Sequence, residues 1–303
     1  MLGMITVESL TKMYGRGLTA VDDVSFTADT GRVTGFLGPN GAGKSTTMRV
    51  IVGLTPATSG TATIEGRRFT DLPNPGTEVG VLLDASAQHA GRTGREILTL
   101  ARRTMGVPGS RVQEMLDLVS LTDDEADRRV RDYSLGMRQR LGIAAALLGD
   151  PHVLILDEPA NGLDPAGIRW MRDPLRGFAD QGGTVLLSSH LLHEIEVIAD
   201  DLVVIGNGRI VAQGTKSDLL TGAGTVVRAR DTAALALAME RAGVVITTHT
   251  DGSLHTDASS DQVGEIALAA HMVLTELRPA DGAGLEEMFL ELTADTQREG
   301  AAA

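Results

Sequence analysis

A glycine-rich stretch carries the residue types that bind a polyphosphate: Gly38-Pro39-Asn40-Gly41-Ala42-Gly43-Lys44-Ser45-Thr46. An apolar run at residues 33–37 precedes it, and residues 45–53 have the pattern of a helix. The G-x-x-x-x-G-K-S spacing between a strand and a helix is typical of a phosphate-binding loop. Glycines let consecutive backbone N–H groups turn toward anionic oxygens, and the positive end of the helix adds to the attraction. We expect Lys44 to reach the β- and γ-phosphates of a nucleoside triphosphate and Ser45 to ligate Mg²⁺.

Two carboxylates and a histidine follow apolar runs that predict buried strands. Asp157 and Glu158 come directly after residues 153–156, and His190 comes shortly after residues 184–187. Ligands of open α/β sheets bind at the carboxyl ends of the strands, so these side chains are expected near the phosphate loop. We expect Asp157 to hold Mg²⁺, Glu158 to polarise the attacking water and neutral His190 to bond the γ-phosphate. A single strand-end acid or histidine is more often an ordinary surface residue, and the order behind a phosphate loop favours the catalytic interpretation.

Composition excludes several classes of protein. The 303 residues suffice for one large domain and a smaller one, and without cysteine no disulfide or thiolate metal site is possible. The net charge of −13 argues against direct binding to DNA or anionic lipid, so no nucleic-acid partner is expected. No apolar run reaches the roughly 18–20 residues that span a bilayer, and the N-terminus has no secretory pattern. We therefore expect a cytoplasmic protein.

Alternation of strands and helices predicts an α/β fold with a mixed, largely parallel sheet. Residues 5–10 and 20–28 read as strands of a small antiparallel layer. The other predicted strands are 61–65, 79–83 and a hairpin over 202–213 that turns at Asn207-Gly208. The predicted helices are 94–105, 111–119, 136–148, one that Asp164 caps, 191–199 and 217–220.

A second, smaller domain follows a glycine-rich linker at residues 221–224. Its pattern predicts strands at 225–229, 244–248, 253–256 and 272–277, with helices at 232–242, 261–270 and 285–292. That order favours a ferredoxin-like α+β module. The predicted domains are therefore 1–221 and 225–294, with a disordered tail at 295–303.

The motifs occur in an order that resembles the nucleotide-binding subunit of an ABC transporter. After the phosphate loop come Tyr133-Ser134-Leu135-Gly136-Met137-Arg138-Gln139, Leu156-Asp157-Glu158-Pro159, Gly162-Leu163-Asp164 and His190. The resemblance covers roughly the first two-thirds of the chain, and it implies an ABC-type P-loop ATPase domain with a helical subdomain. It also implies that Tyr14 stacks on adenine and that Ser134 and Gly136 cap the γ-phosphate of the other subunit. By the same resemblance Asp164 belongs to the loop that links the two sites, and His190 is the switch histidine.

The chain departs from the family pattern in two places. The usual signature reads Leu-Ser-Gly-Gly-Gln, whereas here Leu135 replaces the first glycine and Met137 the glutamine. This variant resembles the bacitracin- and daunorubicin-exporter type of bacterial antibiotic-resistance subfamily. The loop glutamine that senses γ-phosphate and Mg²⁺ is aligned with Asp84, and Gln88 lies four residues on. Asp84 could ligate Mg²⁺ directly or through water, but it adds negative charge beside the phosphates.

The resemblance implies a homodimer that sandwiches ATP and Mg²⁺ and powers export of a drug, antibiotic or peptide through a separate membrane permease. The chain would then lie on the inner face of the membrane through that permease. By the resemblance, the region that receives the permease contains Arg92, Arg95, Arg102 and Arg103, but a solvated helix face is the more common explanation of such residues. Two alternatives stay open: a non-transport ABC ATPase acting on ribosomes or DNA, and an importer ATPase with a regulatory C-terminal domain.

Overall fold

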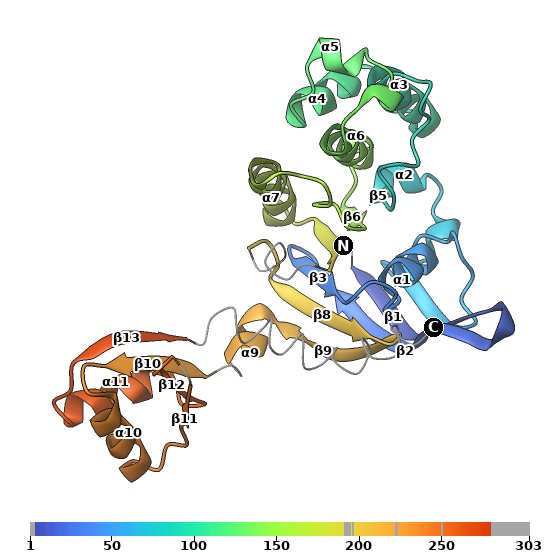
Figure 1. Ribbon diagram of the computed structural model, residues 1–303. Coiled ribbons are helices and arrows are strands. Elements are labelled where there is room, and N and C mark those ends of the chain that lie inside the picture. Colours follow the sequence, from blue (N-terminus) through green and yellow to red (C-terminus); the bar gives the residue numbers. More distant parts are fainter. Residues whose placement is uncertain (1–3, 191–194, 196, 222–223, 250, 280–303) are drawn as a thin grey trace. The chain divides into compact units, whose positions relative to one another are not determined.

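The computed structural model describes residues 4–190, 195, 197–221, 224–249 and 251–279 (Figure 1). The chain divides into two compact units, Met1–Gln213 and Gly214–Ala303. The predicted helix at 285–292 and the tail at 295–303 lie outside the described residues, and so does much of the helix predicted at 191–199. Among the described residues, no helix has both the length and the apolar character needed to cross a bilayer.

A six-stranded sheet forms the centre of the first unit. Its order is β5-β6-β7-β3-β8-β9, and the neighbours from β5 to β8 pair in parallel. The predicted apolar runs produce β3 and β6, in which every residue is buried. Asn207 and Gly208 both have positive φ, as a two-residue hairpin turn requires, so the predicted turn is confirmed. The strands are β3 (Val33–Leu37), β5 (Val79–Leu82), β6 (Val153–Leu156), β7 (Thr184–Ser189), β8 (Asp201–Gly206) and β9 (Arg209–Thr215).

The predicted antiparallel layer is a second sheet of the same unit, with the order β2-β1-β4. Its strands are β1 (Ile5–Tyr14), β2 (Leu18–Ala28) and β4 (Ser59–Ile64). Its apolar residues share one core with the central sheet and with helix α1 (Lys44–Ile51). Phe26 of β2 stacks on Phe36 of β3 with ring centroids 5.2 Å apart, so the two sheets contact each other directly behind the phosphate loop.

A helical region is inserted between β5 and β6 and carries the signature segment (Figure 1). Reciprocal side-chain and backbone bonds cap α3 through Thr93 and Glu96, and cap α5 through Thr122 and Glu125. The helices of the first unit are α1, α2 (Pro75–Glu78), α3 (Gly94–Met105), α4 (Ser110–Leu118), α5 (Asp123–Ala126), α6 (Leu135–Leu147) and α7 (Pro165–Asp180). Short 3-10 turns occupy η1 (Gly15–Gly17), η2 (Phe69–Asp71) and η3 (Val130–Asp132).

The second unit has the predicted ferredoxin-like element order. Its antiparallel sheet has the order β11-β12-β10-β13, and α10 and α11 supply much of the core around Val227, Leu235 and Leu254. The elements are α9 (Lys216–Thr221), β10 (Thr225–Ala229), α10 (Thr232–Arg241), β11 (Thr247–Thr248), β12 (Leu254–Thr256), α11 (Ser260–Ala269) and β13 (Leu274–Pro279).

Two predicted strands of this unit begin too early, for one shared reason. Val244 and Met272 were both expected at strand starts, but each follows a residue with positive φ at a helix end. Their N–H groups donate back to Met239 O and Ala267 O, which is the Schellman closure of a helix. The apolar side chain after such a closure packs into the core, so a buried residue there resembles the first residue of a strand.

Candidate functional site

The phosphate loop lies between β3 and α1 and forms a small hollow of about 180 Å³. Two of its glycines are required by close backbone approach. A Cβ on Gly38 would lie 2.5 Å from Ile205 O, and one on Gly43, where φ is +108°, would lie 2.5 Å from Ala20 O. The hollow is lined by Ala20, Pro39, Asn40, Gly41, Gly43, Lys44, Ser45, Thr46 and Glu158. A larger hollow of about 390 Å³ beside β4 contains none of the predicted site residues.

Lys44 is held at the base of this hollow. Its side chain is only 6% exposed, and Nζ donates to Gly38 O at 2.6 Å and to Pro39 O at 3.3 Å. Nζ also lies 3.4 Å from Glu158 Oε1. A buried ammonium needs such partners, and phosphate oxygens that enter the hollow would offer stronger ones.

The carboxyl ends of β6 and β7 meet beside the phosphate loop, as the sequence predicted. Asp157 is buried, and its Oδ1 accepts a hydrogen bond from Ser188 Oγ at 2.5 Å. The same Ser188 Oγ accepts from the backbone N–H of Glu158 at 2.9 Å. Ser188 is a member of the site that the sequence reasoning missed. The sequence indicates it only as a polar side chain that follows the apolar run at residues 185–187.

The Glu158 carboxylate lies between a lysine and a histidine. One carboxylate oxygen faces Lys44, and the other lies 2.8 Å from His190 Nδ1. Glu158 has φ of +49°, a left-handed conformation that is uncommon for a residue with a side chain. The structure therefore brings Lys44, Glu158 and His190 together, with the carboxylate directed at the phosphate loop.

Two other predicted residues lie outside the hollow. Tyr14 ends β1, is 40% exposed, and has Lys12 Nζ 5.0 Å from its ring centroid, so its face is open to a cation or a flat ring. Asp84 is exposed, and its Oδ1 accepts bonds from the Ser86 hydroxyl at 2.6 Å and from the Ser86 N–H at 2.7 Å. These Ser86 bonds hold the pKa of Asp84 below its usual range, so the carboxyl stays ionised at neutral pH. The adenine contact of Tyr14 and the metal contact of Asp84 stay predictions.

Ser134 and Asp164 each cap the N-terminus of a helix with a side-chain oxygen. Ser134 caps α6 by accepting from Met137 N at 3.2 Å, and Asp164 caps α7 by accepting from Gly167 N at 2.7 Å. The predicted cap at Asp164 is confirmed. Neither residue lines the hollow, and nor does Gly136 on the first turn of α6. Ser134 is exposed, and a helix N-terminus with an exposed hydroxyl offers an anion site to a second molecule.

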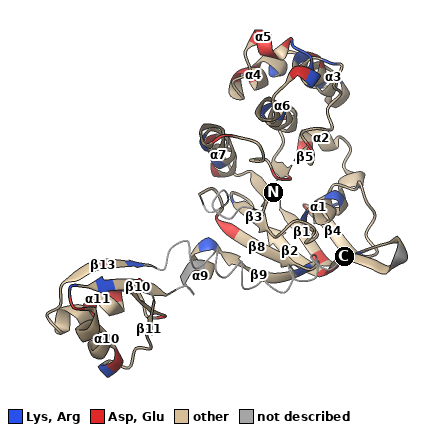
Figure 2. Ribbon diagram, in the orientation of Figure 1, with Lys and Arg blue, Asp and Glu red and all other residues tan. Residues whose placement is uncertain are grey.

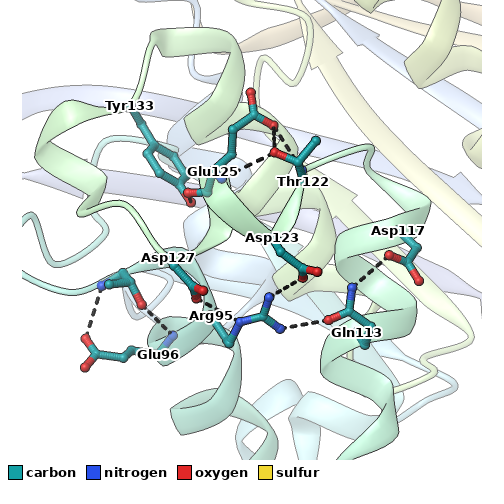
Figure 3. A network of polar contacts seen from close by, with 10 residues as sticks. Arg95, Glu96, Gln113, Asp117, Thr122, Asp123, Glu125, Asp127 and Tyr133 are labelled. Carbon is teal, nitrogen blue, oxygen red and sulfur yellow. Dashed lines mark hydrogen bonds and ion pairs between the residues drawn. The ribbon is translucent and has the colours of Figure 1, made fainter.

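Arg95 in the helical region is a structural residue rather than a free cation. Figure 3 shows Arg95 pointing at Asp123 and Asp127 of the α5 segment and at Gln113 of α4. Its guanidinium nitrogens lie 2.5 Å from Asp123 Oδ1, 2.9 Å from Asp127 Oδ1 and 2.8 Å from Gln113 Oε1. These bonds raise the pKa of Arg95 and tie α3 to the segments around it. Basic and acidic residues are interspersed on these helices (Figure 2). Of the four arginines considered for a partner contact, Arg95 is therefore already bound within the helical region.

Comparison with known proteins places this geometry in a family. Residues 21–161 match the ABC transporter family. An uncharacterized ABC transporter ATP-binding protein of Bacillus subtilis, YhcH, is 43% identical over 211 residues, which is 69% of this chain and 68% of that protein. The bacitracin transport ATP-binding protein BcrA of Enterococcus faecalis is 40% identical over 220 residues, which is 71% of this chain and 70% of that protein. The lantibiotic transport ATP-binding protein SrtF of Streptococcus pyogenes is 37% identical over 69% of this chain and 90% of its own.

Solved structures agree with this assignment. The structure of an ATP-binding subunit of an ABC transporter, 30% identical, superposes with a TM-score of 0.65 over 71% of this chain and 91% of that one. A dimeric bacterial ABC transporter cassette, 22% identical, has the same fold with a TM-score of 0.64, and covers 70% of this chain and 98% of that one. The phosphate loop, the signature segment and the strand-end carboxylates thus have the family's order and the family's fold. This chain belongs to the ATP-binding proteins of ABC transporters, and it is an ATPase.

Proposed function

We propose that two copies of this chain close around two ATP molecules, hydrolyse them and thereby drive an export permease. The observation that carries this proposal is the position of Glu158, whose carboxylate lies between Lys44 Nζ and His190 Nδ1 at the phosphate loop. A carboxylate at that point is suited to take a proton from water that attacks the γ-phosphate. The exposed N-terminus of α6, with Ser134 and Gly136, is suited to receive the γ-phosphate bound by the other copy.

The oxygen donors present fit Mg²⁺, which prefers hydroxyl and carboxylate ligands. Ser45 lines the hollow, and Asp157 presents a buried carboxylate with one oxygen bonded by Ser188. Ser45 and Asp157 would hold the ion, and Asp84 is the third residue we propose, directly or through water. When bound, Mg²⁺ neutralises charge that develops between the β- and γ-phosphates.

The remaining chemistry belongs to the side chains of the chain itself. Lys44 exchanges the Gly38 and Pro39 carbonyls for phosphate oxygens and so orients the triphosphate. Glu158 accepts a proton from the attacking water, and His190 holds the Glu158 carboxylate and bonds the γ-phosphate. Tyr14 stacks on adenine, and Asp164 connects the two sites through the loop that it caps.

Export is the proposed direction of transport. Two relatives are named for bacitracin and lantibiotic transport, and the Ser-Leu-Gly-Met signature resembles that of the bacitracin- and daunorubicin-exporter subfamily. We propose that a drug, antibiotic or peptide passes through a separate multi-span permease, and that the chain attaches to the inner face of the membrane through that permease. Arg92, Arg102 and Arg103 of the α3 region are the cations proposed for that contact.

Affinity capture of the tagged chain from gently solubilised native membranes tests the partner. Mass spectrometry should find one multi-span protein in an amount similar to that of the tagged chain, and reconstitution of the pair in vesicles should give ATP-dependent movement of a peptide antibiotic out of the ATP-containing compartment. Capture of only ribosomal or DNA-maintenance proteins would favour the non-transport alternative. Movement in the opposite direction would favour the importer.

A further inference from the structure

Gln139 is a buried polar residue that no part of the mechanism above uses. It lies one turn into α6, and only 5% of its surface is exposed. Its Nε2 donates to the backbone carbonyls of Glu158 at 3.3 Å and Asn161 at 3.2 Å. Both partners are acceptors, so only the amide nitrogen can occupy this position. The Oε1 atom is buried and has no hydrogen-bond partner among the described residues. The polar contacts that hold this side chain are therefore the two hydrogen bonds from Nε2.

The carbonyl of Glu158 belongs to a peptide unit under unusual constraint. With φ of +49°, Glu158 holds a conformation that is strained for an L-residue and persists only where its surroundings support it. Asn161 N donates to Glu158 O at 3.1 Å and closes a turn. Ser188 Oγ holds the N–H of Glu158, and Gln139 Nε2 holds its carbonyl. The backbone that directs the Glu158 carboxylate is thus fixed on both sides by buried side chains.

Leu135, one turn earlier on the same face of α6, contacts the next part of this loop. A Cβ built on Gly162 would lie 2.1 Å from Leu135 Cδ2, so the leucine packs directly on the glycine backbone. Gly162 also has φ of +77°. Two side chains four residues apart therefore hold the loop from Glu158 to Gly162 against the helix that begins at the signature residue Ser134.

We propose that Gln139 is a positioning residue for hydrolysis, which fixes the Glu158 backbone so that the carboxylate stays directed at the phosphate loop. This inference rests on the proposed role of Glu158. It goes beyond that role, because it links the signature helix to the carboxylate of the same chain through a side chain that does not line the hollow.

The first test is Gln139→Met, which keeps length and bulk and removes both N–H donors. We expect kcat for ATP hydrolysis to fall about 10–100-fold, because a small displacement of a reacting group has a cost of that order. ATP affinity, measured with a non-hydrolysable analogue and Mg²⁺, should stay within about threefold, since Gln139 does not line the hollow. An equal loss of affinity and kcat would indicate general damage and would overturn the inference, as would an unchanged kcat.

The second test is the pH profile of Gln139→Glu, which decides the matter even if the methionine variant folds poorly. The introduced carboxyl faces two carbonyl oxygens, so its ionised form repels them, whereas its protonated form donates one hydrogen bond. The ratio of variant to wild-type kcat should therefore rise as pH falls. Gln262→Glu, at an exposed position of α11, is the matched control and should give a flat ratio near one. A flat ratio for Gln139→Glu would contradict the inference.

Glu158→Gln separates failure of this inference from failure of the proposed function. If Glu158→Gln hydrolyses ATP at the wild-type rate, the role of Glu158 is wrong and Gln139 has nothing to position. If Glu158→Gln is inactive while Gln139→Met keeps the wild-type kcat, the role of Glu158 stands and the inference about Gln139 is wrong.

Discussion

The two units of the chain use charged side chains in different ways. In the first unit, Lys44 is buried, donates to the carbonyls of Gly38 and Pro39, and lies 3.4 Å from Glu158 at the phosphate loop. In the second unit, Arg228 lies 2.5 Å from Asp251 and 3.0 Å from Glu276 on the surface of the sheet, where solvent screens such pairs. Buried charge is costly and is typical of a functional site, whereas exposed ion pairs contribute little to stability. Among the described residues, this difference favours the first unit as the place of the ATP chemistry.

The largest effect should come from Lys44→Ala. Loss of the ammonium removes one fixed donor to the phosphates and leaves Glu158 beside an empty position. Phosphate release should fall by about 10²–10³-fold, the usual effect of removing one such donor. Arg241→Ala, an exposed cation in the second unit, is the control and should keep the full rate. Comparable losses of phosphate release in both variants would contradict the claim that the ATP chemistry belongs to the first unit.

Leu235→Ala tests whether the second unit can be destabilised without loss of ATP hydrolysis. Leu235 is fully buried in the core of that unit, so its truncation should cost about 2–5 kcal/mol of the unit's free energy of unfolding. Leu237→Ala, two residues along α10 at a position 53% exposed, should cost far less. Calorimetry measures both, and ATP hydrolysis at 25 °C should be unchanged in each. A parallel loss of hydrolysis in Leu235→Ala would show that the second unit supports the site.

The sequence predicted much of the first unit because its elements obey local rules. The apolar runs predicted the bounds of β3 and β6, and the cap at Asp164 predicted the start of α7. β1 continues four residues beyond the prediction, because register shifts after Val7 break the alternation that identifies a strand. The contacts of Ser188 and Gln139 join segments about 20–30 residues apart, and no local pattern encodes them. Motifs therefore predicted the side chains that gather at the phosphate loop, but not the residues that hold those side chains in place.

Asp84→Gln should have an intermediate effect on the first unit. If Asp84 reaches the ion directly or through water, its neutral replacement should raise the Mg²⁺ concentration for half-maximal hydrolysis roughly tenfold, the effect typical of a metal-site partner. Asp124→Gln, at an exposed position of α5, is the control. Unchanged hydrolysis and nucleotide affinity in Asp84→Gln would remove Asp84 from the site.

The smallest effect is expected from Asp251→Asn in the second unit. Hydrogen bonds from the N–H and hydroxyl of Ser253, with the nearby Arg228 charge, lower the pKa of Asp251 to about 2. A carboxyl with a lowered folded-state pKa stabilises the fold above its unfolded pKa of about 3.9, and that stabilisation is lost as pH falls toward 2. The variant should therefore flatten the decline in melting temperature between pH 4 and pH 2. Asp257→Asn, an exposed acid of the same unit, should leave the decline as in the wild type.

Light scattering of Glu158→Gln protein in saturating ATP and Mg²⁺ tests the central claim most directly. The variant retains the phosphate loop and the signature helix but should trap the step before hydrolysis. The account predicts a mass near 31.8 kDa without nucleotide and roughly twice that mass with ATP and Mg²⁺. Ser134→Ala in the same background should weaken the dimer, because it removes the hydroxyl at the exposed end of α6. A Glu158→Gln protein that stays monomeric with saturating ATP and Mg²⁺ would contradict the proposal that two copies close around ATP and share the two nucleotide sites.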